Sequence, residues 1–367
     1  MKKSLTSLIA VTASVISAGA FATTNLENPL YLPKAGEAYV KAGAAIMGKS
    51  VEGTQATKRK HRDGDVEFPV WRFTGDLGYG ITDRLDIHGR FGYTKDGEID
   101  RKGMHRGRIG MTFRALTEES PIVWDLYADA YLSGITPMKG TYTPNGFNFD
   151  NYSNGRWGAI FGTRFGKTWN KFTLAAHIEY LQTFGNNNNK IKLDPRLRPL
   201  DGKFADTSNP LHAYEALLND VTMTQLGFPD EISVDLKSTH EGTAGFDMLY
   251  QANQKWSFGF GFEYVEHYNN GVKGIHTQLA EPNIPGGLPA NVQKDLQSGV
   301  VNGLLAETAN MKDGWDEYIL KLSAAYQMTD SVQLAPFFEY TFDDAQPMSQ
   351  NATDFKMELG VRLNARF

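Results

Sequence analysis

Apolar and polar residues alternate along the final stretch of the chain, from Asp354 to Phe367. One parity is apolar throughout and ends on an aromatic residue: Phe355, Met357, Leu359, Val361, Leu363, Ala365 and Phe367. The other parity is mostly charged: Lys356, Glu358, Gly360, Arg362, Asn364 and Arg366. A period of two residues predicts a β-strand with unlike faces. Such a strand fits the edge of a soluble sandwich or a membrane-spanning barrel whose apolar face meets lipid.

Further stretches repeat this alternation, with apolar or aromatic residues on one parity and polar or charged residues on the other. They are Glu37–Met47, Phe68–Ile81, Leu85–Thr94, Arg108–Thr117, Ile122–Ser133, Arg156–Trp169, Phe172–Gln182, Asp235–Tyr250, Trp256–Glu266, Glu317–Gln327 and Val332–Phe342. With the closing stretch they predict about twelve strands, each of roughly the length that a tilted transmembrane strand needs. Pro336 cannot donate to a ladder of backbone hydrogen bonds, so it predicts a β-bulge.

The connections between these stretches alternate in length. Tight turns are expected near Asp83, Glu119, Asn170, Gln254 and Asp330. Longer connections are expected near Thr57, Gly97, Thr143, Leu200, Pro285 and Pro347. An even strand number with short turns at one end and long loops at the other is typical of outer-membrane barrels. The sequence therefore predicts an all-β, antiparallel up-and-down barrel with both termini in the periplasm.

Two of the long loops, at about 186–233 and 268–314, contain segments that resemble helices. Leu211–Val221 follows a proline, and Ala290–Ala306 repeats apolar residues on one helical face. A connection of this length without structure of its own is uncommon in a compact protein. We therefore expect one or both loops to fold over or into the mouth of the barrel and narrow it.

The amino terminus has the pattern of a secretory signal peptide. Lys2 and Lys3 precede an uncharged apolar stretch from Leu5 to Phe21, and Ala20-Phe21-Ala22 matches a small-x-small cleavage site. Cleavage is expected after Ala22. Residues 23–36 then form a short periplasmic segment, and residues 37–367 form the barrel. The pattern predicts export through a cleaved signal peptide.

Composition restricts the possible chemistry. The chain has no cysteine, so it offers neither a disulfide nor a thiolate metal ligand. Its formal net charge of −5 disfavours nucleic-acid binding. After Ala22 no apolar run approaches the roughly 20 residues of a spanning helix, so a membrane crossing must use strands.

On these features the chain resembles the porin-like β-barrels of the Gram-negative outer membrane. The resemblance covers about Glu37 to Phe367 and the signal peptide. It implies location in the cell outer membrane, contact with lipid and lipopolysaccharide, and no cofactor. It also implies that Phe367 belongs to an assembly signal read by the barrel-assembly machinery. A basic loop cluster either meets lipopolysaccharide phosphates or is simply solvated: Lys190, Lys192, Arg196, Arg198 and Lys203.

The predicted inward parity carries charges whose sign tends to alternate between neighbouring strands. These residues are Arg72, Asp76, Asp86, Arg90, Arg108, Arg114, Asp125, Asp129, Arg164, Glu179, Glu263, Lys321, Glu339 and Arg362. Opposite charges on facing strands stabilise a sheet by about 0.2–1 kcal/mol a pair. The set is therefore either a structural salt-bridge lining or a track for polar solutes, and the two interpretations are compatible.

Catalytic and metal signals are weak. Ser153-Asn154-Gly155-Arg156 is similar to part of the motif of outer-membrane phospholipase A, but Asn151 stands where that family has its catalytic histidine. Asparagine cannot take a proton from serine. His88 and His177 lie strands apart, without the spacing of a metal site. The sequence predicts neither an enzyme nor a metalloprotein.

Two functions remain. The first is a channel for passive or substrate-selective diffusion of small polar solutes, with weak preference between small anions and cations because the lumen charges nearly balance. The alternative is a closed structural barrel that acts through its long loops. A passenger-exporting barrel is disfavoured because only about Thr23 to Gly36 precedes the first strand. A lipocalin-like binder would need the opposite facing of the two parities.

Overall fold

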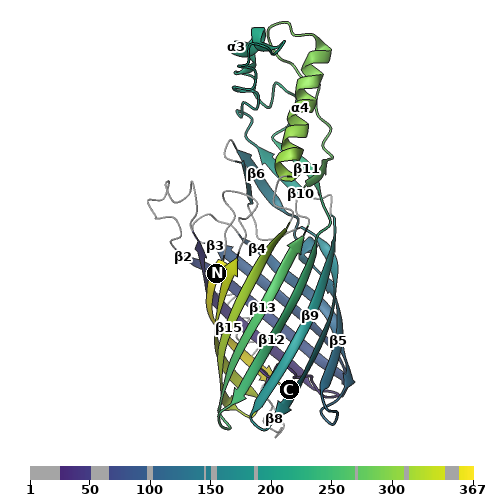
Figure 1. The fold of residues 1–367 in the computed structure, drawn as a ribbon, viewed down its shortest axis with the longest axis vertical. Coiled ribbons are helices and arrows are strands. Elements are labelled where there is room, and N and C mark those ends of the chain that lie inside the picture. The colour runs from purple at the N-terminus through teal and green to yellow at the C-terminus, as the bar shows by residue number, and fades with distance from the viewer. Residues whose placement is uncertain are drawn as a thin grey trace.

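A computed structural model describes residues 25–50, 66–96, 102–143, 146–149, 155–185, 189–268, 272–309, 314–343 and 355–367. Twelve antiparallel strands close into a barrel, and a second, smaller sheet stands beyond one end of it (Figure 1). The barrel strands are β1 Ala38–Ser50, β2 Val66–Thr82, β3 Leu85–Asp96, β4 Lys102–Leu116, β5 Val123–Tyr131, β8 Trp157–Trp169, β9 Phe172–Phe184, β12 His240–Gln251, β13 Trp256–Tyr268, β15 Gly314–Thr329, β16 Val332–Asp343 and β17 Phe355–Arg366. The predicted fold class and strand number are confirmed.

The first and last strands close the barrel. β1 pairs antiparallel with β17, and Tyr39 lies opposite Arg366. At the end of this seam Ala38 donates its N–H to the Phe367 carbonyl at 3.0 Å, and Phe367 donates to the Ala38 carbonyl at 2.8 Å. The seam satisfies the edges of both terminal strands, which would otherwise present unpaired backbone groups.

The two faces of each strand differ as the alternation predicts. Large apolar side chains such as Phe161, Phe260 and Leu359 are exposed on the outer wall. Charged side chains of the other parity, such as Asp125 and Glu358, are buried inside it. An apolar exterior around a polar interior is the arrangement of a barrel that spans a membrane.

Among the described residues, none of the helices combines the length and the apolar character that a bilayer crossing requires.

Tight turns join the strand pairs at one end of the barrel, which we call the turn end (Figure 1). In the turn between β8 and β9, Asn170 has a φ of 49°. Asparagine tolerates this left-handed conformation better than most residues, which explains why a two-residue connection suffices there.

Two predicted details of the strands are wrong. The pairing of β15 with β16 keeps one register on both sides of Pro336, from Ser323 opposite Phe337 to Tyr326 opposite Leu334. Pro336 also stays in register with Val361 of β17, so the missing N–H leaves a gap in the ladder and no bulge. The stretch from Asp235 is likewise divided, because its first residues belong to a separate strand outside the barrel.

The small sheet is built from three long connections at the other end, the loop end. Its strand order is β14-β11-β10-β6-β7, and its members are β6 Lys139–Thr143, β7 Gly146–Phe149, β10 Asn189–Leu193, β11 Glu231–Leu236 and β14 Val272–Ile275. The same connections carry η1 Ser133–Ile135, η2 His212–Tyr214, α3 Glu215–Leu218 and α4 Ala290–Ala309. We call this unit the cap. It rises above the barrel with α4 upright along it (Figure 1).

The cap has a hydrophobic core separate from the barrel. Ile191, Leu226 and Ile232 are fully buried in it, and α4 contributes Leu296 and Val300. The helix predicted over Ala290–Ala306 is confirmed as α4. The helix-like segment Leu211–Val221 forms only the short η2 and α3, because the chain leaves the helix after Leu218 to bury Val221 in the same core.

Candidate functional site

The segment Asn25–Gly36 crosses the inside of the barrel near its turn end, and we call it the floor. Its contacts start on one wall. The Asn25 amide donates to Gln251 Oε1 at 3.0 Å and to Ser257 Oγ at 2.9 Å. The Leu26 backbone N–H donates to Gln333 Oε1 at 3.0 Å. Leu26 itself is almost completely buried. Two amide side chains and one hydroxyl of inward-facing positions therefore hold the beginning of the floor.

Glu27 fixes the floor to the closing seam. Arg362 Nη2 lies 2.9 Å from Glu27 Oε2, and the Asn364 amide donates to Glu27 Oε1 at 2.7 Å. Lys41 Nζ lies 3.9 Å from the same carboxylate and donates to the Leu26 carbonyl at 2.6 Å. Burial alone would raise the pKa of Glu27, but the two cations and the amide hold this pKa below its ordinary value. The carboxylate is therefore a charged anchor.

The floor ends on the opposite walls. Leu30 packs against Val123 of β5 and Ala175 of β9. The Leu30 carbonyl accepts a hydrogen bond from Arg114 Nη2 at 2.6 Å. Further on, Gly36 donates its N–H to the Gly80 carbonyl at 2.8 Å. The sequence predicts only a short periplasmic segment here, because a stretch with two prolines and no periodicity carries no signal for a position inside the lumen.

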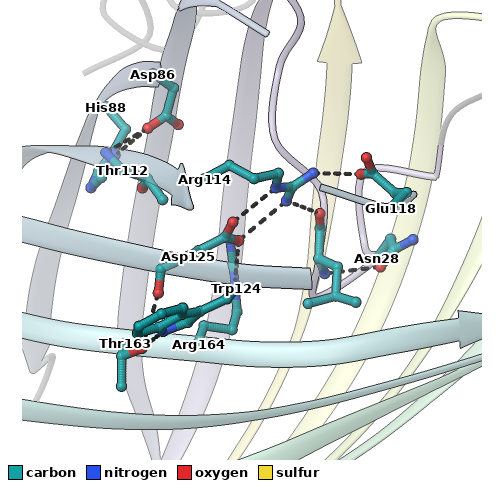
Figure 2. A network of polar contacts seen from close by, with 11 residues as sticks. Asn28, Asp86, His88, Thr112, Arg114, Glu118, Trp124, Asp125, Thr163 and Arg164 are labelled. Atoms are coloured by element: carbon teal, nitrogen blue, oxygen red, sulfur yellow. Dashed lines mark hydrogen bonds and ion pairs between the residues drawn. The ribbon is translucent and has the colours of Figure 1, made fainter. Parts of the chain in front are cut away.

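Arg114 joins the floor to the wall (Figure 2). Its Nε lies 2.8 Å from Asp125 Oδ1, and its Nη1 lies 2.5 Å from Glu118 Oε1. Asp125 also receives Arg164 Nη2 at 2.7 Å on its second oxygen. One fully buried carboxylate thus serves two arginines of neighbouring strands. Asp125 is directly in register with Arg114 on one side and with Arg164 on the other.

Above the floor, charged pairs line the middle of the lumen. Arg90 Nε lies 3.0 Å from Asp76 Oδ1, and these two residues are also register partners. Arg108 reaches farther along the wall, with Nη1 3.0 Å from Glu179 Oε2 and Nε 3.5 Å from Asp129 Oδ2. The register places Arg108 opposite Tyr131, so both of its carboxylates are reached diagonally.

The lining continues on the far wall. Arg72 Nη1 lies 2.6 Å from Glu358 Oε2. Lys321 pairs with Glu263, and the register places Glu339 directly opposite Lys321. Together with the pairs already described, and with Asp86, which pairs with His88, these contacts place every predicted inward charge on the lumen side of the wall.

Three histidines each bridge two carboxylates inside the barrel. His88 Nδ1 lies 3.3 Å from Asp86 Oδ1 and His88 Nε2 lies 3.0 Å from Asp129 Oδ1. His177 bridges Asp247 at 3.6 Å and Glu263 at 3.2 Å. The third bridge, of His267 to Glu241 at 2.9 Å and Glu317 at 3.5 Å, lies toward the loop end. Carboxylates on opposite ring nitrogens orient the imidazole and leave it no free nitrogen for a metal.

Several lumen residues were not among the predicted charges. They are Glu27, Lys41, Asp247, Glu241, His267 and Glu317. The parity rule was sufficient to find His267 and Glu317, because each shares its strand and its parity with a predicted charge, Glu263 on β13 and Lys321 on β15. Glu27 had no such signal, since it precedes the first strand.

Two other predicted features are the lipase-like segment and the basic loop cluster. Residues 151–154, which include the serine of the lipase-like segment, fall outside the described residues. The neighbouring Arg156 is buried, and its Nε donates to the Lys237 carbonyl at 2.9 Å. In the basic loop cluster, Lys190 pairs with Glu231, Arg196 with Asp194 and Arg198 with Asp220, at 2.6, 3.3 and 2.8 Å. Acidic partners within the cap thus offset much of its positive charge.

The comparisons with solved structures return outer-membrane channels. An outer-membrane channel of Pseudomonas putida F1 aligns over 96% of this chain and 100% of its own, with 11% identity and a TM-score of 0.49. The NanC porin aligns over 90% and 98%, with 9% identity and a TM-score of 0.37. A variant of the monoaromatic hydrocarbon channel TodX aligns over 93% and 92%, with 8% identity and a TM-score of 0.38. They are an outer-membrane channel, a porin and a hydrocarbon channel, and none carries a solute assignment over to this chain.

No protein-family model matches the chain. No curated protein matches it either.

Proposed function

We propose that this protein is an outer-membrane channel through which small polar solutes diffuse along the barrel lumen. The observation that carries the proposal is the exposure of Arg90. Its side chain points into the closed barrel, pairs with Asp76 there, and is nevertheless 52% exposed. A half-exposed charged side chain inside a barrel wall means that a water-sized space stands beside it at mid-lumen. A closed structural barrel would instead fill this space with side chains.

The orientation follows from the two ends of the barrel. Outer-membrane barrels place short turns on the periplasmic side and long loops on the outside. The turn end with the floor would then face the periplasm, and the cap would face the cell exterior. A signal peptide cleaved after Ala22 would bring the mature chain there, with lipid and lipopolysaccharide around the apolar wall. The barrel-assembly machinery would read the strand that ends on Phe367.

The floor makes this channel narrow. It touches β1, β4, β5, β9, β12, β13, β16 and β17 and so spans the cross-section at the turn end. Solutes must pass beside it, which favours small molecules. We infer selective or passive diffusion of small polar solutes, without catalysis, because the charged groups of the lumen are arranged as ion pairs and histidine bridges with no activated nucleophile among the described residues.

Conductance in planar bilayers tests the proposal. The mature chain, refolded in detergent and inserted at low concentration, should produce discrete steps of current. Heat-modifiable migration on a gel provides the control, because it shows independently that the barrel is folded. A folded, heat-modifiable barrel that carries no current would contradict the channel function.

The cap favours a second candidate. Its own core of buried residues, including Leu218, Met223 and Leu226, gives it a defined shape outside the barrel. A barrel that conducts nothing would therefore be better explained as a support for a binding surface. The absence of current, together with normal folding, distinguishes this alternative from the channel.

A further inference from the structure

The arginines of the lumen face the solute path while their carboxylate partners lie behind them. Arg90 is 52% exposed and its partner Asp76 is 19% exposed. Arg164 is 26% exposed above a fully buried Asp125. Arg362 is 27% exposed and Glu27 is 8% exposed. The formal charges nearly balance, but the surface that a solute meets is mainly cationic.

In two further pairs the cation is again the more exposed partner, and two acidic residues depart from this order. Two cations depart from it as well, since Arg114 is less exposed than Glu118 and Arg366 is less exposed than Glu37. Arg72 is more exposed than Glu358, and Lys321 is more exposed than Glu263. Glu179 is as exposed as its partner Arg108, and Asp247, beside His177, is 34% exposed. Asp247 is thus a local anionic patch in an otherwise cationic path.

Arg90 also has donors that the protein does not use. Its Nε bonds Asp76, and within the described ranges no protein atom bonds its Nη1 or Nη2. Arg108 lies directly opposite Arg90 on the neighbouring strand, and its Nη2 likewise has no partner among the described residues. Two guanidinium groups with unused N–H donors therefore stand side by side at mid-lumen. Like charges on facing strands are unfavourable unless something binds between or above them.

We propose that Arg90 and Arg108 form an anion-binding subsite of the channel and that its solutes are small organic acids, recognised through a carboxylate. A planar guanidinium presents two parallel N–H donors that match both oxygens of a carboxylate. The low-dielectric wall of a barrel focuses the field of such groups into the lumen, so exposed cations outweigh buried anions. This inference rests on the proposed channel function and adds the substrate class.

The test uses the full mature chain in planar bilayers, with succinate as the probe and neutral succinamide as its matched analogue. In a KCl gradient the reversal potential should have the sign that indicates preference for chloride over potassium. Succinate should block the current, and succinamide should not. The variant Arg90→Gln should weaken the block about tenfold and reduce the chloride preference, since a charged hydrogen-bonded contact is lost. Arg90→Lys should keep the chloride preference, because the charge remains. It should still weaken the block, because an ammonium group lacks the two parallel N–H donors of a guanidinium.

Two control variants separate the subsite from general charge effects. Arg84→Gln removes an exposed arginine in the tight turn between β2 and β3 and should change neither measurement. The double variant Asp76→Asn/Arg90→Gln removes the whole pair, so a loss of block in this variant cannot come from an unmasked Asp76. Chloride preference and block that survive both Arg90 substitutions would overturn the subsite.

A second measurement does not depend on current. Binding to the folded state raises thermal stability as the ligand concentration rises above its Kd, so succinate should raise the Tm of the detergent-folded barrel, and Arg90→Gln should abolish the shift. A conducting barrel with cation preference and no succinate shift would disprove the inference but keep the channel. A folded barrel without current but with the shift would disprove the channel and leave a carboxylate-binding barrel.

Discussion

At the scale of single residues, the lumen contains buried carboxylates that each bind more than one cationic side chain. Asp125 accepts hydrogen bonds from Arg114 on both oxygens and from Arg164 on Oδ2, and it is fully buried. Glu118 also binds Arg114 but is 69% exposed. Removing one partner from a buried ion pair is far more costly than removing a solvated one, because the charges left behind have no counterion.

Asp125→Asn should therefore lower the free energy of unfolding by about 3 kcal/mol. Glu118→Gln removes a charge from the same arginine at the rim and should cost less than about 1 kcal/mol. Urea titration of the refolded barrel in lipid vesicles measures both. Equal losses for the two variants would show that burial of Asp125 does not set the strength of this cluster.

A second prediction at the scale of residues concerns which side chains of β13 point outward to lipid and which point into the lumen. Phe260 is exposed on the outer wall of β13, and the next residue, Gly261, points inward beside Asp247. Phe260→Arg should cost about 2–4 kcal/mol, because it places a charge in the lipid-facing band. Gly261→Arg should fold in higher yield, because the new cation can pair with Asp247, whose side chain must turn aside to admit it.

Folding yield by heat-modifiable migration measures the pair, and conductance adds a second reading. Gly261→Arg should narrow the lumen and reduce the current through a single channel. The opposite ranking of folding yields would mean that the two parities of β13 are assigned the wrong way round.

At the scale of elements, the floor is a segment without regular structure that is held by side chains of many strands. Its one charged anchor is Glu27, which contacts Lys41, Arg362 and Asn364. Because the pKa of Glu27 in the folded protein lies below its ordinary value of 4.5, the anchor is charged and contributes its full stability above that pH. The contribution is lost as the pH falls through the lowered pKa.

Conductance of the native channel should therefore rise in acid below about pH 4.5, when Glu27 takes up a proton and the floor loosens. Glu27→Gln should show the raised conductance already at neutral pH. Asp194→Asn in the cap is the matched control, since that carboxylate also has a lowered pKa, caused by its hydrogen bonds with Arg196, but lies outside the barrel. A rise in acid that persists in Glu27→Gln would assign the effect to another group.

At the scale of the whole molecule, the barrel exists only when its two ends meet. Phe367 donates and accepts the last backbone hydrogen bonds of the seam with Ala38, and the strand before it presents Leu359 and Val361 to the outside. Deletion of Phe367 should therefore remove both the terminal aromatic residue and the end of the seam. We expect poor insertion and low levels in the outer membrane.

Phe367→Tyr is the control, because it keeps an aromatic ring and both backbone groups. Surface labelling and heat-modifiable migration measure the two variants. Normal levels of the deletion variant in the membrane would show that closure does not depend on this residue.

The alternation of apolar and polar residues determined the wall by itself. A strand has a period of two wherever it lies, and lipid gives every outer face the same environment, so each strand carries its own signal. From this followed the twelve strands, the tight turns and the inward facing of residues as distant as Arg72 and Glu339. Direct pairs such as Asp76 with Arg90 also followed, because a tight hairpin fixes its register locally.

The contents of the barrel were decided only by the tertiary structure. The floor has no periodicity, and its position depends on partners such as Gln333 and Arg362 that lie about three hundred residues away in sequence. The cap joins strands from three connections, and no one of them could bury its apolar residues alone. The diagonal reach of Arg108 to Glu179 arises for the same reason, since closure and tilt determine which side chains meet across the lumen.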